Sequence, residues 1–191
     1  MNKMIDNLSA EVIHDYIKKF NERQDLTIVE EVLSELFEKY PNNQNLRDIL
    51  IKVTTLNALF STNIFAIVEV SKHILVKDID ENLRVNSLGL INEISVMEIG
   101  GKVRNNYSFA TKYCHWHRPE TYPIYDSYVS DLLWKYAKRD RFMNFSQSDF
   151  RDYPKYKQIL ERFRGHYGLS QFTTKELDKF LWLHGRELSR N

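Results

Sequence analysis

Cysteine, glycine and proline are all scarce in this chain of 191 residues, which contains one cysteine, six glycines and four prolines. The single thiol, Cys114, cannot close an internal disulfide. The chain does not open with a charged segment followed by an apolar run and a small-residue cleavage site, so nothing marks it for secretion. These absences predict a cytoplasmic protein.

Long apolar runs are also missing. The longest, residues 63–68, is far shorter than the roughly 20 residues that a membrane helix needs, so we expect no membrane contact. No Ser/Gly linker or internal repeat divides the chain, and its 42% hydrophobic content is enough for a packed core. We expect one compact helical domain over residues 1–191, with one lobe formed by about 1–50 plus the C-terminal helix and another by 51–170.

Acidic residues are few in the second half of the chain. Residues 101–191 hold 17 Lys and Arg against 10 Asp and Glu, whereas residues 1–100 hold 10 against 16. A basic half of this kind can mark a side that faces a polyanion. The alternative is that the two halves neutralise each other and leave no net patch.

A helical period is present wherever a period can be recognised. Apolar residues recur on one helical face between positions 12 and 20, behind the favourable N-cap Ser9. Thr27 and Glu30 form a capping box in the sequence, and Pro41 ends the helix that they begin. Further helices are expected from about residues 43 and 63, and at about 87–97, 103–117, 127–138, 154–166 and 174–188. Because no alternating run is bounded by an Asn-Gly or Asp-Gly turn, we expect no strand pair and an all-α fold.

One carboxylate, that of Asp126, lies between a proline turn and an apolar helix, in the stretch YPIYDSYV that runs from Tyr122 to Val129. It can accept hydrogen bonds from the first free backbone N–H groups of that helix, a role worth about 1 kcal/mol. It can also take part in chemistry. The residues leave both interpretations open.

The residues around Asp126 follow a wider pattern. Ile124, Asp126 and Val129 match the motif hydrophobic-x-Asp-x-x-Val. With residues 108–114 and 122–133, they resemble the second hairpin helix, the loop and the catalytic-aspartate helix of the helix-hairpin-helix DNA glycosylases. The resemblance covers roughly residues 50–190 in helix order. It implies a two-lobed helical fold with the site in a cleft between the lobes.

The same resemblance implies a protein that binds DNA and excises a base as a monofunctional N-glycosylase. Asp126 would stabilise a developing sugar oxocarbenium ion or activate a water, once the base has left the duplex. Five residues would contact the DNA: Gly100, Gly101, Lys102, Lys112 and Arg118. Three tyrosines would stack on the extruded base: Tyr122, Tyr125 and Tyr128.

Departures from the family pattern favour an alternative. The family's leucine-proline-glycine-valine-glycine hairpin is replaced by residues 97–103, and the lysine of bifunctional members falls at Ser108, with Lys112 or Lys102 as displaced substitutes. One cysteine cannot hold the iron–sulfur cluster of some members, so no cofactor is expected. The alternative is a catalytically inactive nucleic-acid or protein interaction module of the same fold. A third is an unrelated helical bundle in which Asp126 is only a cap.

The run from Cys114 to His117 raises the question of zinc, because thiolate and imidazole are preferred zinc ligands. On a helix, positions 114 and 117 share a face while His115 points elsewhere. Further ligands, His166 and His184, would have to arrive from distant helices. A packed or partly exposed helix end explains the same residues, and no metal is expected.

Overall fold

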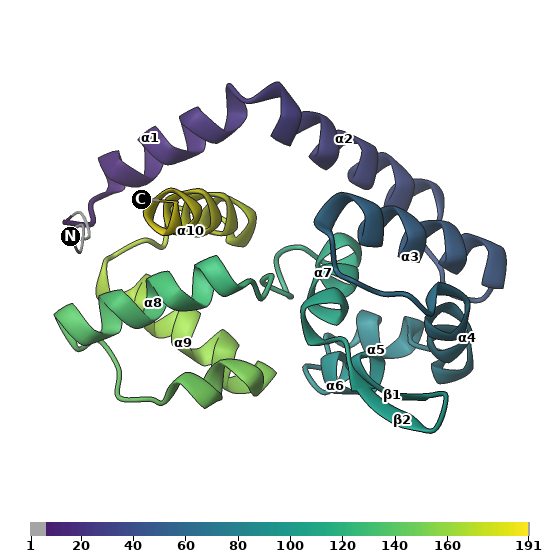
Figure 1. Cartoon of the computed structure of the whole chain (residues 1–191). Helices are drawn as coiled ribbons and strands as arrows, with labels where there is room; N and C mark the ends of the chain where they lie inside the picture. The colour runs from purple at the N-terminus through teal and green to yellow at the C-terminus, as the bar shows by residue number, and fades with distance from the viewer. Residues whose placement is uncertain (1–6, 191) are drawn as a thin grey trace. The chain divides into compact units, whose positions relative to one another are not determined.

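Helices dominate the computed structural model, which describes residues 7–190 (Figure 1). The mostly helical class predicted from the sequence is confirmed. None of the helices within the described range is long and apolar enough to cross a membrane. The elements in chain order are α1 (Ala10–Asn21), α2 (Gln24–Lys39), α3 (Leu46–Phe60), α4 (Ile67–Lys77), α5 (Asp80–Arg84), α6 (Leu90–Ser95), β1 (Val96–Ile99), β2 (Lys102–Asn105), α7 (Tyr107–His117), α8 (Ser127–Asp140), the 3₁₀ helix η1 (Gln147–Arg151), α9 (Tyr153–His166) and α10 (Thr174–Ser189).

The chain divides into two compact units. Unit 1 combines the described residues 7–27 with 125–190, and unit 2 is the continuous segment Ile28–Ile124. These units divide after residues 27 and 124, whereas the expected lobes divided at about residues 50 and 170. The second boundary lies before α8 because α8 packs on α10 and so belongs with the C-terminal helix.

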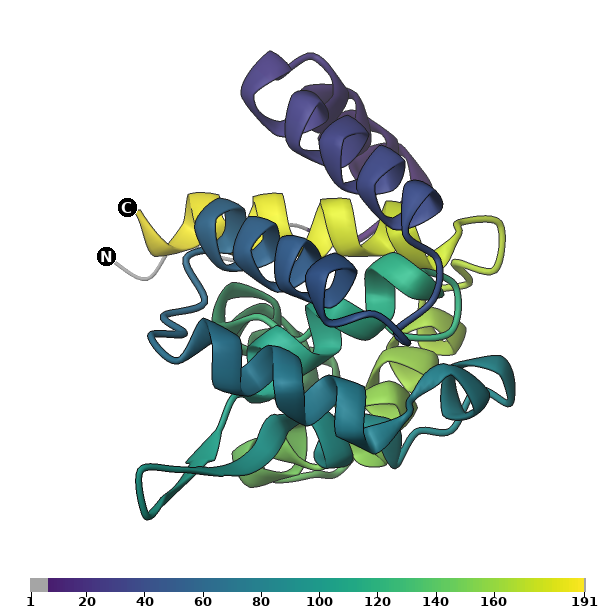
Figure 2. The same cartoon turned by 90° about the vertical axis from the view of Figure 1, so that its right-hand side faces the viewer.

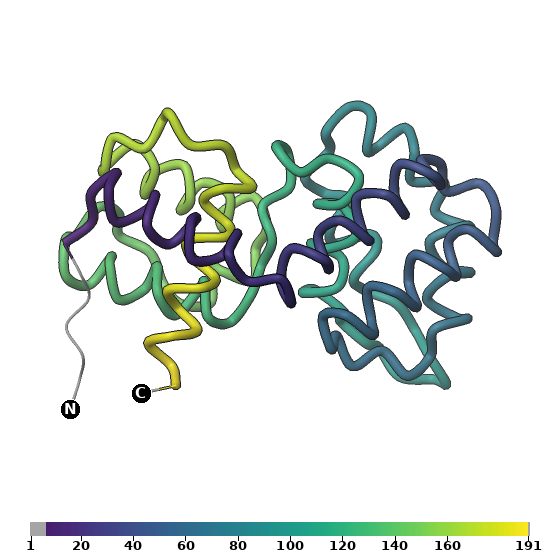
Figure 3. Tube along the Cα trace, turned by 90° about the horizontal axis from the view of Figure 1, so that it is seen from above, coloured from purple at the N-terminus to yellow at the C-terminus, as the bar shows by residue number. Residues whose placement is uncertain are grey.

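In unit 1, the C-terminal helix α10 packs against both α1 and α8. The apolar stripe predicted for α1 is the face that it buries, and α1 runs across α10 when seen from above (Figure 3). The Tyr16 ring stacks on His184 of α10, with 4.7 Å between ring centroids. Phe20 meets Trp182 edge to face. Aromatic contacts therefore join the two ends of the chain.

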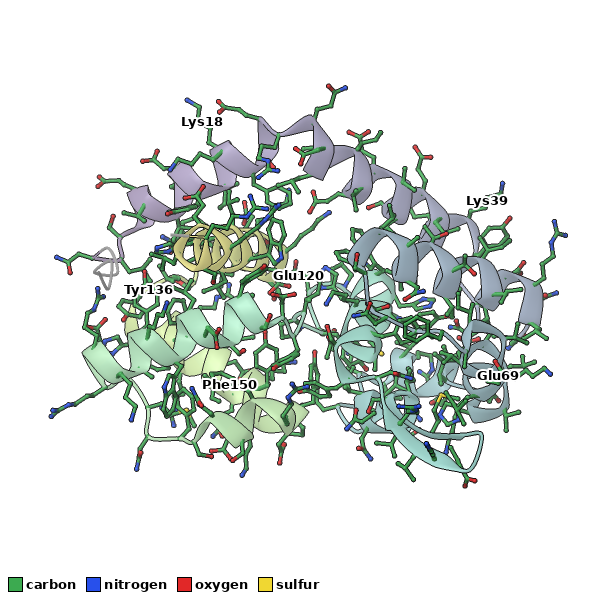
Figure 4. The ribbon with its side chains drawn as sticks, viewed as in Figure 1. Lys18, Lys39, Glu69, Glu120, Tyr136 and Phe150 are labelled. Atoms are coloured by element: carbon green, nitrogen blue, oxygen red, sulfur yellow. The ribbon has the colours of Figure 1, made fainter. Side chains whose placement is uncertain are left out.

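The contact between α10 and α8 is close enough to require a glycine. A Cβ atom built on Gly185 would lie 2.4 Å from the backbone oxygen of Tyr128, in the first turn of α8. Further along α8, the completely buried Tyr136 ring contacts Phe163 of α9. Figure 4 shows Tyr136 and Phe150 among the closely packed side chains of unit 1.

In unit 2, α3 packs against α4 and α7, and α7 packs against α6. The residues that α3 buries include Ile49, Val53 and Leu56, whose helical spacing predicts this shared face. Helix α3 begins at Leu46 with Asn45 as its cap, and α4 begins at Ile67, so both start a few residues later than expected.

A β-hairpin interrupts the helices of unit 2, so the prediction that no strand pair would occur was wrong. Strands β1 and β2 pair antiparallel, with Val96 opposite Asn105. Gly100 and Gly101 form the turn, with φ of 58° and 73°. Positive φ at both turn residues is the type I′ geometry, which Gly-Gly adopts as readily as Asn-Gly. The helices expected at 87–97 and 103–117 are shortened accordingly, and the hairpin projects from unit 2 (Figure 2).

The two predicted helix starts near the N-terminus had different outcomes. The Ser9 hydroxyl accepts a hydrogen bond from the Val12 N–H at 3.3 Å, which confirms the cap of α1. The capping box at Thr27 was wrong. Helix α2 already begins at Gln24, and the Thr27 hydroxyl donates to the backbone oxygen of Arg23 at 3.4 Å.

We expect Gly185→Ala to lower the free energy of unfolding by about 1–3 kcal/mol, because the added methyl group overpacks the α8–α10 contact. Gly165→Ala in α9 is the matched control, since a Cβ there meets nothing within 4 Å. It should raise stability by a few tenths to about 1 kcal/mol, because alanine is the better helix former. Denaturant unfolding of both variants measures the difference. Equal effects would show that the contact is not tight.

Candidate functional site

Asp126 caps helix α8. Its backbone is extended, with φ −142° and ψ 150°, and its Oδ1 atom accepts a hydrogen bond from the Tyr128 N–H at 2.9 Å. The side chain is half-buried. Val129, the last residue of the motif, is 2% exposed and fixes the first turn of α8 in the core of unit 1. The predicted cap is confirmed, and it gives the carboxylate a defined direction at the surface of the unit.

The three tyrosines proposed to stack on a base lie in different environments. Tyr122 is completely buried, and its hydroxyl donates to the backbone oxygen of Ser87 at 3.1 Å. Burial raises its pKa. Tyr125 is also buried, with the Arg151 guanidinium 4.9 Å from its ring centre. Only Tyr128 of the three is partly exposed. Because the rings of Tyr122 and Tyr125 are buried in this conformation, they are poorly placed to stack on a base.

The five residues predicted to contact DNA also separate by exposure. Lys112 is buried, donates to the Ser108 hydroxyl at 2.6 Å and lies over the Phe60 ring. An ammonium enclosed in this way is poorly placed to meet a phosphate. The exposed members are Gly100, Gly101, Lys102 and Arg118. The two glycines lie in the turn of a β-hairpin and not in a turn between two helices. They therefore do not form the helical hairpin whose backbone N–H groups were expected to approach a DNA phosphate.

The side chains of the Cys114–His117 segment lie in different surroundings and do not converge. Cys114 is completely buried, and burial raises its pKa. His115 is buried and donates from Nδ1 to the backbone oxygen of Tyr122 at 2.9 Å. His117 belongs to a separate polar cluster. Within residues 7–190, no three side chains of His, Cys, Asp or Glu are grouped to hold a metal ion.

That polar cluster centres on Lys52, a residue that sequence reasoning did not select. Lys52 lies on the core-facing side of α3 and is 0% exposed. Its ammonium donates to the backbone oxygens of Tyr40 and Asn42, both at 3.0 Å, and to Asn43 Oδ1 at 2.7 Å. A lysine between Ile49 and Leu56 in an apolar stripe was the available sequence signal.

Asn43 connects this ammonium to a carboxylate. Its Oδ1 atom also accepts from the Tyr113 hydroxyl at 2.5 Å, and its Nδ2 group donates to Asp80 at 2.7 Å. The Asn43 backbone N–H donates to the same carboxylate at 3.0 Å. Positive and negative groups are therefore joined through one buried amide, whose orientation is fixed by two donors on one side and an acceptor on the other.

The protonation state of His117 follows from its neighbours. Its Nε2 atom lies 3.3 Å from both Lys52 Nζ and Asn43 Nδ2, which are donors. Nε2 must therefore be the acceptor, and the ring is neutral. Burial and the adjacent Lys52 charge hold the pKa of His117 well below its usual range. Burial likewise lowers the pKa of Lys52 to about 8, which leaves it mostly charged at neutral pH.

Comparison with known proteins assigns the chain to a family. Residues 12–121 match the family HI_0787_N, described as an N-terminal domain. This chain belongs to the HI_0787_N family. An uncharacterized protein from Haemophilus influenzae is 44% identical over 141 residues, which cover 73% of this chain and 67% of the relative. No solved structure matches the chain.

The HI_0787_N match includes one candidate region and excludes the other. The Lys52 cluster and the β1–β2 hairpin lie within residues 12–121, and Asp126 lies just beyond them. The family description names no ligand or reaction. The chemistry of both regions therefore has to be argued from their own side chains.

Replacing Lys52 should strongly destabilise this HI_0787_N protein. Lys52→Met leaves the Tyr40, Asn42 and Asn43 oxygens without their buried donor, so we expect a loss of about 3–5 kcal/mol in the free energy of unfolding. Lys72→Met, at an exposed lysine on α4 of the same unit, should change it by less than about 0.5 kcal/mol. Urea unfolding compares the two. Equal stabilities would show that the cluster is dispensable.

Stability should fall as pH drops below about 6.5, the pKa of histidine in an unfolded chain. Below that pH, His117 is protonated in the unfolded state but stays neutral in the folded state. Proton uptake therefore stabilises the unfolded state relative to the folded state. Above it the contribution of His117 is fully present. His117→Gln keeps an acceptor oxygen but cannot take up this proton.

Between pH 6.5 and 5, the free energy of unfolding of His117→Gln should therefore fall less steeply than that of the wild type. The difference between the two slopes should be at most about 1.4 kcal/mol per pH unit. Unfolding at several pH values measures both slopes. Parallel slopes for the two proteins would contradict the assigned role of His117.

Proposed function

We propose that this protein binds DNA and acts as a monofunctional N-glycosylase whose carboxylate is Asp126. The observation that carries the proposal is the placement of Asp126. It caps α8 at the surface of unit 1, with the Tyr128 N–H fixing Oδ1 and buried Val129 anchoring the turn. A carboxylate oriented by a rigid helix is suited to stabilising positive charge that develops on a substrate.

The proposed reaction starts after the target nucleotide has left the duplex. The bond between the sugar C1′ atom and the base nitrogen breaks, and its electron pair leaves with the base. Asp126 stabilises the resulting oxocarbenium ion, a water adds to C1′, and the proton that this water gives up neutralises the departing base. Tyr128, half-buried beside Asp126, supplies an aromatic surface near the reacting sugar.

Exposed basic residues support the DNA-binding part of the proposal. Between Glu98 and Glu120 the chain has no acidic residue. Three of the four lysines and arginines in that segment are exposed: Lys102, Arg104 and Arg118. Exposed cations are the groups that neutralise phosphates and release counterions.

A second candidate is a binding module of the same fold without catalysis. The hydrogen bond from Tyr128 gives the Asp126 carboxylate a purely structural task. Ser108 stands where bifunctional glycosylases have lysine, and the neighbouring Lys112 is enclosed by Ser108 and Phe60. The structural use of the Asp126 carboxylate favours binding without base release, whereas the missing and enclosed lysines count only against a lyase step.

Asp126→Asn should separate the two candidates, because asparagine preserves the cap but removes the charge. We expect base release from duplexes carrying one deaminated, oxidised or alkylated base to fall about 100-fold or more in single-turnover assays, with binding unchanged. Asp131→Asn is the matched control, since Asp131 is exposed on the same helix. Asp126→Ala should also cost about 1 kcal/mol of stability through the lost cap.

Two results would count against the proposal, and they differ. Base release that survives Asp126→Asn, or a wild-type protein that binds DNA but releases no base, removes the catalytic role and leaves the binding module. Affinity for duplex DNA that does not fall as salt rises removes DNA binding itself, because phosphate contacts release counterions.

A further inference from the structure

The β1–β2 hairpin has one strand anchored and one strand exposed. Strand β1 packs against α4 and α6, and its Met97 side chain is 7% exposed. All four residues of β2, Lys102 to Asn105, are exposed. The hairpin is therefore held to unit 2 along β1 while β2 and the Gly100–Gly101 turn face solvent.

The register divides the side chains between two faces. Residues opposite or two apart share a face, so Val96, Glu98, Val103 and Asn105 lie on one side. The other side carries buried Met97 and points toward the body of unit 2. The outward face includes Val103, which is 75% exposed although it is apolar. An apolar side chain at this exposed position gains nothing from contact with water, and it is available to contact a ligand.

The two cations of β2 alternate with Val103 and Asn105 along the strand. Lys102 and Arg104 lie on the inward side of the register, but both side chains are exposed at the free edge. Glu98 is the one carboxylate of the hairpin, and it lies opposite Val103. Unit 2 as a whole has 10 basic and 12 acidic residues. Two adjacent cations on one exposed strand are therefore a local feature of the hairpin.

We infer that the β1–β2 hairpin enters the major groove of duplex DNA, an inference that rests on the proposed function. Lys102 and Arg104 contact phosphates along the groove wall, and the outward face presents Val103 and Asn105 to the base edges. Valine can contact the thymine methyl group, and asparagine can pair with adenine.

The size of the hairpin fits this role. A four-residue antiparallel strand is about 14 Å long, and paired strands lie about 4.8 Å apart. The major groove is about 12 Å wide and admits a two-stranded ribbon, whereas the minor groove is about 6 Å wide. The two-residue type I′ turn keeps the tip narrow, and neither Gly100 nor Gly101 adds a side chain to it.

The test measures how the affinity for a short undamaged duplex changes with salt, by fluorescence anisotropy. Lys102→Ala/Arg104→Ala removes two phosphate contacts, so the slope of log affinity against log salt should fall by about 2. Glu98→Gln removes the opposing charge and should strengthen binding. The matched control is Lys39→Ala/Arg47→Ala, which removes one lysine and one arginine that are exposed on α2 and α3 of unit 2.

One of the control residues, Lys39 at the end of α2, is well separated from the hairpin within unit 2. The end of α2 lies on the opposite side of the unit from β1 and β2 in both side views, and Lys39 points outward (Figures 1, 2 and 4). The control should retain the wild-type slope. Thermal melting of each variant confirms that all of them are folded.

A second arm identifies the groove. A duplex whose cytosines carry a glucosylated 5-hydroxymethyl group has a blocked major groove and should bind the wild type much more weakly, whereas distamycin in the minor groove should not compete. The opposite pattern overturns the inference. If the wild type shows steep salt dependence and Lys102→Ala/Arg104→Ala keeps the same slope, the hairpin inference is also overturned. The proposed function is not affected by that result. A wild type that binds no duplex overturns both.

Discussion

The fold of unit 2 depends on solvating one buried ammonium group. Lys52 has no contact with water, and a buried charge is costly unless polar groups replace its hydration. The acceptors come from the loop after α2 and from α7, and Asn43 extends the network to Asp80 at the start of α5. Because α3 carries the lysine, four parts of the chain have to come together before its charge is satisfied. The network therefore specifies how these elements assemble.

Burial also decides which reactive groups are available for function. Lys112, His115 and Tyr122 carry groups that could serve a ligand, yet all three are enclosed within unit 2. Asp126 and the side chains of β2 remain at the surface, on backbone held by a helix cap and by strand register. The proposed chemistry and the proposed groove contact use these accessible groups, while the most polar cluster of the molecule serves its stability.

Features that depend on neighbouring residues were the easiest to predict. The apolar stripe of α1, the Ser9 cap and the Asp126 cap each involve residues within a few positions of one another. The Thr27 capping box failed although its sequence pattern was correct, because helical hydrogen bonding already begins at Gln24. The hairpin was not predicted because its turn is Gly-Gly and contains no Asn or Asp before the glycine. Its Gly-Gly turn carries the same local signal.

The sequence by itself determined the helical class, most helix positions and the caps at Ser9 and Asp126, because these follow from periodicity and from hydrogen bonds within one turn. Only the tertiary structure decided the partners of Lys52, which lie between 9 and 65 residues away along the chain. It also decided that Gly185 meets Tyr128 and that Tyr122 is enclosed while Tyr128 is not. Such contacts join residues far apart in the chain, and no local pattern encodes which distant groups will meet.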